Sequence, residues 1–379
     1  MKINVLQVLN SLGRGGIESL VRDLCQNMDR SRINIEVAIM DGKSLDQYET
    51  FCKMGIKIHT YPRLTIKTAP AFLKWWKDFF AEHKGYYKIV DIHTFTTAAL
   101  YVKYAKQSGA YVIVHSHSVI PEKAQFKSTV KRKGKIIRRF LYRQLQSDRY
   151  IDFRMACSKM AGEGVFGSKP FQILNNGIVV NNYQFDEKAR KELRERNGWN
   201  ESLIVGHVGN GTGAKKYEFL LEMFNELHKL KPDSRLLLIG KLETLESKLR
   251  QYAQEHNLLD SISFLGVRND VPALMSAMDV FVFPSLYEGL GIVLIEAQAE
   301  GLPCIVSDQV PSEANISPLF HTVSLSSGST NWAEVTINAY MKNKQSDRTK
   351  ATSYLKKSGY DIVSVAKCLE NLYMNIGKE

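Results

Sequence analysis

The stretch VFVFPSLYEGLGIVLIEAQAE at residues 280–300 carries the most informative pattern in the chain. Four apolar residues predict a short buried strand at 280–283, and the apolar run that resumes at Ile292 predicts a helix. Gly289 and Gly291 punctuate the turn between them. Backbone N–H groups and the dipole at a helix start favour anions, and glycines let a phosphate approach the backbone. The alternative is an ordinary strand–turn–helix whose glutamates are solvated.

The same alternation of short apolar runs and longer helical periodicity extends along the chain in both directions. It predicts strands at 3–9, 35–39, 88–92, 111–115, 153–156 and 171–174 and, after a restart near residue 200, at 203–208, 235–239, 262–265, 280–283 and 303–306. Helices are expected between these strands. Strand–helix alternation is typical of parallel α/β sheets, so we expect two Rossmann-like halves facing a central cleft.

Three segments together resemble a known family. EGLGIVLIEAQAEGLPCIVSD at 288–308 is similar to the E-x7-E segment of the retaining glycosyltransferases of family 4, which have the GT-B fold. FLGVRNDVPALMSAMDVFVFPS just before it, and SLGRGGIESLV near the start, resemble the family's other characteristic segments. The resemblance implies transfer, with retention, of a hexose or N-acetylhexosamine from a nucleotide sugar. A UDP-sugar is favoured as donor, a saccharide or polyprenyl-linked saccharide is the implied acceptor, and exopolysaccharide or capsule biosynthesis is the implied context.

The resemblance also implies roles for residues of this sequence. It places Glu288 beside the donor sugar as a catalytic residue and Glu296 at the ribose hydroxyls. His117, just beyond the predicted strand 111–115, is the second implied catalytic residue, also next to the sugar. The other implied donor contacts are Gly15 and Gly16 in the N-terminal glycine loop, Val267 and Arg268 at the base, and Leu290, Gly291, Ile292 and Val293 at the diphosphate.

The glycine-containing loop at 208–216 is expected to neutralise the leaving diphosphate. The family usually has an arginine after Val-Gly and a lysine five residues later; Lys215 matches, but Asn210 replaces the arginine. Losing a charged hydrogen bond costs about 1.5–3 kcal/mol, or roughly ten- to a hundredfold in affinity or rate. Two rival motifs fail in this loop, because a dinucleotide site lacks its acidic residue after the next strand and a P-loop lacks its flanking Gly and Ser/Thr.

The pair His115 and His117 lies where parallel sheets present functional groups. The structural alternative is a pair of polar histidines at a strand end. A metal site would need a third ligand, which the sequence does not identify. No Asp-x-Asp triplet occurs in the chain. We therefore expect no metal, and no cofactor beyond the nucleotide-sugar co-substrate.

Domain boundaries are predicted from the restart of the pattern. An N-terminal acceptor domain is expected at 1–183 and a C-terminal donor domain at 184–350, with the polar stretch 175–200 as the connector. The apolar residues of 361–376 share one helical face, which predicts a packed amphipathic helix. The family resemblance implies that the last segment, 351–379, crosses back to the N-terminal domain.

The positive charge is concentrated in the first half of the chain. Residues 1–180 carry 29 Lys and Arg against 14 Asp and Glu, a net charge of +15, whereas the remainder has −3. Ten of the basic residues lie between Lys123 and Arg149. A basic amphipathic helix there would suit an anionic membrane surface, and a solvated helix packed on the core is the alternative. Nucleic acid is not expected as a partner, because no binding motif accompanies the charge.

The first residues of the sequence, its apolar stretches and its cysteines together predict the cellular location. MKINVLQVLNSLGRGG does not read as a signal peptide, no apolar stretch reaches the ~18 residues of a membrane helix, and five scattered cysteines fit a reducing compartment. We expect a cytoplasmic protein that attaches peripherally to the inner face of the membrane. Two other functions stay open: a non-catalytic partner with the same fold, which Asn210 motivates, and a nucleotide-sugar epimerase.

Overall fold

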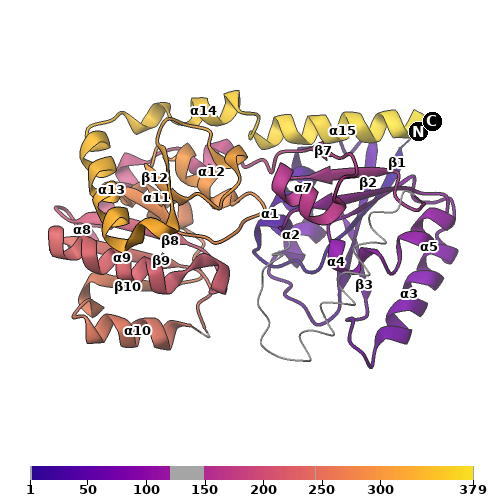
Figure 1. Cartoon of the computed structure of the whole chain (residues 1–379). Helices are drawn as coiled ribbons and strands as arrows, with labels where there is room; N and C mark the ends of the chain where they lie inside the picture. Colours follow the sequence, from indigo (N-terminus) through magenta and orange to yellow (C-terminus); the bar gives the residue numbers. More distant parts are fainter. Residues whose placement is uncertain (1, 120–148, 244, 379) are drawn as a thin grey trace. The chain divides into compact units, whose positions relative to one another are not determined.

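The computed structural model of the chain describes residues 2–119, 149–243 and 245–378. Their contacts divide the chain into unit 1, Met1–Gly177 with Ile362–Glu379, and unit 2, Ile178–Asp361. Figure 1 shows a helix-covered sheet in each unit, with unit 1 coloured from indigo to magenta and including the yellow last helix. Except for Arg149, the predicted basic segment at 123–149 lies outside the described residues.

Unit 1 is built on a parallel sheet with the strand order β3-β2-β1-β4-β5-β6-β7. Its strands are β1 Ile3–Val8, β2 Ile33–Met40, β3 Lys57–Tyr61, β4 Ile89–Ile92, β5 Tyr111–Ser116, β6 Phe153–Ala156 and β7 Gln172–Ile173. The central strands are apolar on both faces, since a parallel sheet is covered on both sides. The strand order reverses between β1 and β4, and ligands of open α/β sheets usually bind at the carboxyl edge of such a switch point.

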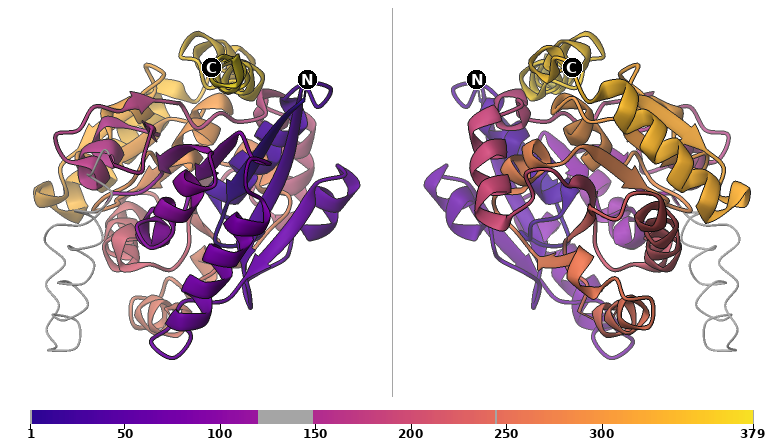
Figure 2. Two further views of the ribbon diagram at one scale, coloured as in Figure 1. Left: turned by 90° about the vertical axis from the view of Figure 1, so that its right-hand side faces the viewer. Right: turned by 90° about the vertical axis from the view of Figure 1, so that its left-hand side faces the viewer.

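The α-helices of unit 1 among the described residues are α1 Gly16–Asn27, α2 Tyr48–Lys53, α3 Ala69–Glu82, α4 Phe95–Ala98, α5 Val102–Gln107, α7 Lys159–Phe166 and α15 Ile362–Lys378. Helix α15 buries Val365, Leu369 and Ile376 from one face, as its periodicity predicts. Its Glu370 accepts a hydrogen bond from the backbone N–H of Asp29, just after α1. Both ends of the chain therefore belong to unit 1 (Figure 2).

Unit 2 repeats the architecture with a six-stranded parallel sheet in the order β10-β9-β8-β11-β12-β13. Its strands are β8 Leu203–Val208, β9 Ser234–Ile239, β10 Ile262–Gly266, β11 Val280–Phe283, β12 Cys304–Ser307 and β13 Phe320–Val323. Its α-helices are α8 Glu187–Asn197, α9 Tyr217–Leu230, α10 Glu246–Glu255, α11 Val271–Ala277, α12 Ile292–Ala299, α13 Gly328–Asn343 and α14 Thr352–Lys357. The switch point of this sheet lies between β8 and β11.

The two Rossmann-like sheets confirm the predicted fold class, but several local predictions differ from the structure. The stretch 175–200 is not simply a connector, because it contains helix α8. Strands β3 and β13 have no counterpart among the predicted strands. The contacts place the unit boundaries after Gly177 and Asp361, where 183 and 350 were predicted, and α14 belongs to unit 2.

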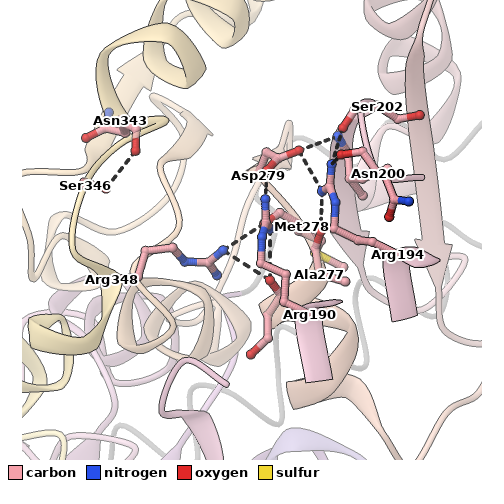
Figure 3. Close-up of polar contacts among 12 residues, drawn as sticks. Arg190, Arg194, Asn200, Ser202, Ala277, Met278, Asp279, Asn343, Ser346 and Arg348 are labelled. Carbon is pink, nitrogen blue, oxygen red and sulfur yellow. Dashed lines mark hydrogen bonds and ion pairs between the residues drawn. The ribbon is translucent and has the colours of Figure 1, made fainter. Parts of the chain in front are cut away.

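An arginine cluster holds α8 against the amino edge of the unit 2 sheet. Figure 3 shows the guanidinium groups of Arg190, Arg194 and Arg348 around Met278 and Asp279. Arg190 and Arg194 both pair with Asp279, which precedes β11. All three arginines also donate to backbone carbonyls at the end of α11, where a helix leaves its last C=O groups without intrahelical partners. The cluster therefore caps α11 and fixes α8 to it.

No helix in the described part of the chain combines the length and the apolar character needed to cross a membrane.

Candidate active site

The turn between β11 and α12 lies at the carboxyl edge of the unit 2 sheet. Gly291 precedes the helix with φ +80° and ψ +62°, a left-handed conformation that glycine adopts without steric cost. Leu290 and Val293 are buried and hold the turn to the core, whereas Gly291 and Ile292 are partly exposed. The first backbone N–H groups of α12 therefore start at a partly exposed turn, which suits an anion.

Lys215 and Glu288 form an ion pair at the switch point of this sheet. Lys215 ends the short helix Gly213–Lys215 after β8, and Glu288 lies in the turn after β11. The distance from Lys215 Nζ to Glu288 Oε1 is 2.6 Å, and each side chain is 15% exposed. The same ammonium lies 4.1 Å from the centre of the Phe283 ring, a cation–π contact. Two predicted site residues, 73 positions apart, are thus in direct contact.

Burial sets the electrostatics around this pair. It lowers the pKa of the Lys215 ammonium below its usual value, while the neighbouring Glu288 carboxylate opposes that shift. Behind the pair, burial lowers the pKa of His207 to about 3, so its ring is neutral at physiological pH. His207 Nδ1 lies 2.8 Å from the carbonyl oxygen of Val282. An anion arriving at Lys215 would favour the charged ammonium further.

Backbone hydrogen bonds fix the loop that carries Lys215. Gly211 N donates to the carbonyl of Lys241, and Leu286 N donates to the carbonyl of Ala214. These bonds tie the loop to the segment after β9 and to the turn after β11. Lys216, which follows Lys215, has φ +50°, an uncommon conformation for a residue with a side chain. Such a conformation persists only where the surroundings hold it, which fits a loop of fixed geometry.

Glu296 and Asn210 lie near this centre in the chain but have different surroundings. Glu296 lies in the second turn of α12. Its Oε1 accepts a hydrogen bond from Tyr183 Oη, at 2.8 Å. Tyr183 ends the short helix Val180–Tyr183, and no sequence pattern singled it out. Asn210, which replaces the expected arginine, is exposed on the loop after β8.

The predicted base-pocket residues follow β10. Val267 is 57% exposed, a high fraction for an apolar residue. The guanidinium of Arg268 donates to both carboxylate oxygens of Asp270, at 2.8 and 2.6 Å. Those hydrogen bonds lower the pKa of Asp270. Arg268 is therefore already engaged by a carboxylate, while Val267 offers an open apolar surface.

In unit 1, the glycine loop after β1 is shaped by Glu18. Gly15 precedes α1, and Ser11 Oγ donates to Glu18 Oε1 at 2.6 Å. A Cβ atom on Gly15 would come within 2.3 Å of Glu18 Oε2, so the carboxylate occupies the space that a side chain would need. Gly16, the first residue of the helix, follows directly. A phosphate approaching Gly15 from that side would meet this carboxylate, which the sequence prediction for Gly15 and Gly16 did not consider.

Three buried histidines gather at the switch point of unit 1. His93, after β4, lies with its Nδ1 2.8 Å from His117 Nε2. The ring centres of His115 and His117 are 4.0 Å apart. Burial lowers the pKa of His93 to about 3 and those of the other two well below the usual value. The trio is therefore neutral at physiological pH.

His93 was missed because a single histidine after an apolar run looks unremarkable. The signal was nonetheless available, since the predicted strands 88–92 and 111–115 follow each other and parallel strands align their carboxyl ends. Ring nitrogens of His93, His115 and His117 all lie within 4.8 Å of one another. His93 is therefore the third ligand that a metal site at His115 and His117 would need. Both units thus have a polar cluster at the switch point of the sheet.

Comparison with known proteins accounts for both units. A family model described as "Glycosyltransferase Family 4" matches residues 14–178, and one described as "Glycosyl transferases group 1" matches residues 189–355. EpsF of Bacillus subtilis (strain 168), which is classed as a glycosyltransferase, is 29% identical over 383 aligned positions that cover 99% of this chain and 97% of EpsF.

A solved structure of Anabaena HepE in complex with UDP-glucose has a TM-score of 0.79 and 18% identity to this chain, covering 98% of this chain and all of HepE. This chain is a glycosyltransferase of the GT-B fold. A shorter part of the glycosyltransferase, 81 aligned residues or 21% of the chain, is 43% identical to an Escherichia coli enzyme named UDP-Gal:alpha-D-GlcNAc-diphosphoundecaprenol alpha-1,3-galactosyltransferase, covering 21% of that enzyme.

Proposed function

We propose that the enzyme transfers a hexose or N-acetylhexosamine from a UDP-sugar to a saccharide or polyprenyl-linked saccharide, with retention, during surface polysaccharide synthesis. The observation that carries the proposal is the Lys215–Glu288 pair beside the N-terminus of α12. The pair offers a cation to the leaving diphosphate and a carboxylate to the sugar. The name of the Escherichia coli relative, a UDP-galactose enzyme acting on an undecaprenol-linked sugar, supports this donor and acceptor class.

Charge on the departing nucleoside diphosphate is met in this proposal by fixed groups. The Lys215 ammonium and the amides of Gly291, Ile292 and Val293 would hold the phosphate oxygens, helped by the α12 dipole. Because Lys215 already lies in a partly buried site and is oriented by Glu288, little reorganisation is needed when the donor binds. Preorganised donors of this kind stabilise charge that develops in the transition state.

Retention follows if the acceptor attacks the anomeric carbon on the face from which the phosphate leaves. The C–O bond from the anomeric carbon to the phosphate breaks while the acceptor hydroxyl attacks the same face, and the phosphate oxygen takes the hydroxyl proton. No separate enzymatic base is then needed. Glu288 would orient a sugar hydroxyl, and His117 would contact the sugar from unit 1.

The nucleoside would be held by three further residues. Glu296 would accept hydrogen bonds from the ribose hydroxyls, exchanging them with the one it now receives from Tyr183. Val267 would pack on the base, and Arg268, held by Asp270, would border it. Gly15 and Gly16 would lie at the acceptor side of the donor. We further propose that the reaction needs no metal and that the basic half attaches to an anionic membrane surface.

Donor binding and sugar transfer test the proposal separately. A panel of nucleotide sugars is screened for thermal stabilisation, because a ligand that binds the native state raises the melting temperature. Transfer is then followed with the best donor and lipid-linked or free saccharide acceptors. We expect stabilisation by a UDP-sugar and by UDP. Stabilisation by no nucleotide sugar, or by a donor with another base alone, would contradict the donor assignment.

Glu288→Gln then tests the catalytic assignment. Transfer is expected to fall at least tenfold while UDP affinity is kept, because the amide preserves the shape but loses the charge-assisted hydrogen bond to the sugar. Glu243→Gln is the matched control, since Glu243 pairs with Lys241 in the same unit but is exposed. Equal turnover of Glu288→Gln and the native enzyme would exclude Glu288 from the reaction.

A further inference from the structure

A chain of buried hydrogen bonds connects His117 to the last helix of the protein. His117 Nε2 lies 2.8 Å from His93 Nδ1, and His93 Nε2 lies 2.7 Å from Gln7 Oε1. Gln7 Nε2 donates to Tyr373 Oη at 2.8 Å, and Tyr373 Oη donates to Asp91 Oδ2 at 2.6 Å. The chain thus joins β1, β4, the end of β5 and α15, all within unit 1.

The direction of each hydrogen bond follows from the Asp91 end. There the carboxylate oxygen Asp91 Oδ2 accepts the hydrogen bond that Tyr373 Oη donates. Tyr373 has one proton, which it gives to Asp91, so its oxygen accepts from the Gln7 amide. The carbonyl oxygen of Gln7 then faces His93.

This polarity determines both histidine tautomers. Gln7 Oε1 requires a proton on His93 Nε2, and that nitrogen also faces Asp91 Oδ1 at 3.8 Å. His93 Nδ1 is then an acceptor, so His117 Nε2 must carry the proton between them. A neutral imidazole has only one N–H, and therefore His117 Nδ1 is left as an acceptor. Which nitrogen of a histidine is protonated is set by the hydrogen bond that the other one makes.

We propose that Gln7, His93 and Tyr373 are positioning residues that hold His117 neutral with Nδ1 as an acceptor for a hydroxyl of the transferred sugar. The inference rests on the proposed function for its substrate. Sugar hydroxyls are donors as well as acceptors, so a fixed acceptor gives an orientation that a freely tautomerising ring would not. Asn176 lies next to this nitrogen, with Oδ1 3.2 Å from His117 Nδ1.

The proposal requires the Asn176 amide to present its NH₂ group to His117. The oxygen and nitrogen of such an amide exchange places by a half-turn, and the hydrogen-bond network decides between them. If the oxygen faced His117 instead, His117 Nδ1 would carry the proton. The facing nitrogens of His93 and His117 would then both lack a proton at 2.8 Å, and their lone pairs would repel each other unless both nitrogens bound a cation. His115, with neither ring nitrogen hydrogen-bonded in the described structure, would supply its third ligand.

Tyr373→Phe tests the chain at its far end. The variant removes one hydroxyl from α15 and frees the Gln7 amide to turn, so His93 and His117 lose their fixed tautomers. Tyr87→Phe is the matched control, because Tyr87 also donates from a buried phenol to a carboxylate of unit 1, at 2.8 Å to Glu36, but lies before β4 at the opposite edge. Both variants lose a similar hydrogen bond, but only Tyr373→Phe removes a member of the hydrogen-bond chain that leads to His117.

Two measurements at pH 8 decide the outcome. Nitrogen-15 NMR of histidine-labelled native protein is expected to show His93 and His117 protonated at Nε2, and Tyr373→Phe should mix these tautomers while Tyr87→Phe does not. Transfer by Tyr373→Phe should fall about three- to tenfold at unchanged UDP affinity. The tautomer measurement needs no substrate, so it stays decisive even if the proposed donor is wrong.

Either of two results would overturn the proposal. One is His117 protonated at Nδ1 in the native protein, above all with a stoichiometric transition metal in the purified enzyme or with zinc binding that His115→Ala abolishes. The other is equal tautomer spectra and equal transfer for Tyr373→Phe and Tyr87→Phe, which would reduce the chain to packing.

Discussion

At the switch point of unit 1 three neutral histidines lie together, whereas at the switch point of unit 2 a lysine pairs with a glutamate. The sheets have closely similar topologies, and in both of them a glycine-containing loop follows the first strand. Burial accounts for the chemical difference. His93, His115 and His117 are at most 7% exposed, while Lys215 and Glu288 are each 15% exposed and paired.

Under the proposed function, this difference would adapt one architecture to two parts of one substrate. Fully buried groups are cheapest when neutral, because a charge without solvent or partner is costly. Such groups recognise hydroxyls by hydrogen bonds. A paired charge in a partly exposed turn can be kept and then turned toward a phosphate. In that case the histidines of unit 1 would bind hydroxyls of the neutral sugar, and the lysine of unit 2 would bind the charged diphosphate.

The largest effect is expected where charge serves only the fold. Arg194→Leu removes an arginine that is buried against Asp279 and the carbonyl of Ala277 in the cluster of Figure 3. Breaking a buried ion pair costs about 3–5 kcal/mol, so calorimetry should show unit 2 unfolding at a much lower temperature. Arg250→Leu is the control, because its pair with Glu246 is exposed and should contribute less than ~1 kcal/mol. Similar losses in both variants would mean that the cluster adds nothing to the fold.

The next effect concerns charge that serves the substrate. Lys215→Met keeps an apolar stem over Phe283 but removes the ammonium, so transfer and UDP affinity should both fall roughly ten- to a hundredfold. Lys241→Met, which breaks an exposed pair with Glu243, should change neither. If Lys215→Met bound UDP as tightly as the native enzyme, the unit 2 pair would not be a diphosphate site, and the contrast between the two units would lose its chemical meaning.

The sequence predicted several members of these two clusters but not the contacts between them. Lys215, Glu288 and His117 were each singled out by resemblance to the family's segments, yet the Lys215–Glu288 pair joins segments 73 positions apart. Such a contact depends on the β8–β11 pairing, which periodicity does not encode. His93 was missed, although the order of the predicted strands would have brought it to His117. Gln7 and Tyr373 gave no local signal, because one lies inside a strand and the other on the apolar face of α15.

The fold itself was predicted where burial leaves a periodic trace. Strands apolar on both faces, such as β11, were found from their runs of apolar residues. Strand β3, KIHTY, is an edge strand with exposed polar residues and has no such trace. Helix α8, EKARKELRERN, buries little more than Leu193 and the capping Arg194, so its sequence looks like a polar connector. Tertiary contacts, here the arginine cluster, decide such elements.

A smaller effect is expected from Asp91, the buried acid at the end of the hydrogen-bond chain from His117. The pKa of Asp91 is raised by burial to about 7, so the native state binds its proton more tightly than the unfolded state does. As pH rises from about 4, the usual pKa of an aspartate, to pH 7, the folded protein is therefore destabilised through this group. The full loss in the free energy of unfolding is present above pH 7. Asp91→Asn escapes the cost and keeps an oxygen for Tyr373.

Melting temperatures of Asp91→Asn and the native protein are compared at pH 4.5 and pH 8. The advantage of the variant should grow toward pH 8, where a gain on the order of 1 kcal/mol would raise the melting temperature by about 2–4 °C. The neutral histidines contribute to both proteins and cancel in this difference. Asp78→Asn, at an exposed position on α3, should show no such growth. An advantage that shrinks toward pH 8 would contradict the assignment of Asp91 as a buried carboxylate without a cationic partner.

The smallest expected effect is that of chelation, for which we predict no change. Transfer after dialysis against EDTA should equal that of untreated enzyme, because the proposal meets the diphosphate charge with Lys215 and backbone amides and holds the histidines by hydrogen bonds. If this prediction is wrong, the metal that restores transfer would show which unit binds it. A loss restored by magnesium or manganese, with weaker UDP binding, would place an oxygen-liganded metal at the diphosphate. A loss restored only by zinc, at unchanged UDP affinity, would place an imidazole-bound metal on His93, His115 and His117. Each result would remove one half of the comparison and leave the other intact.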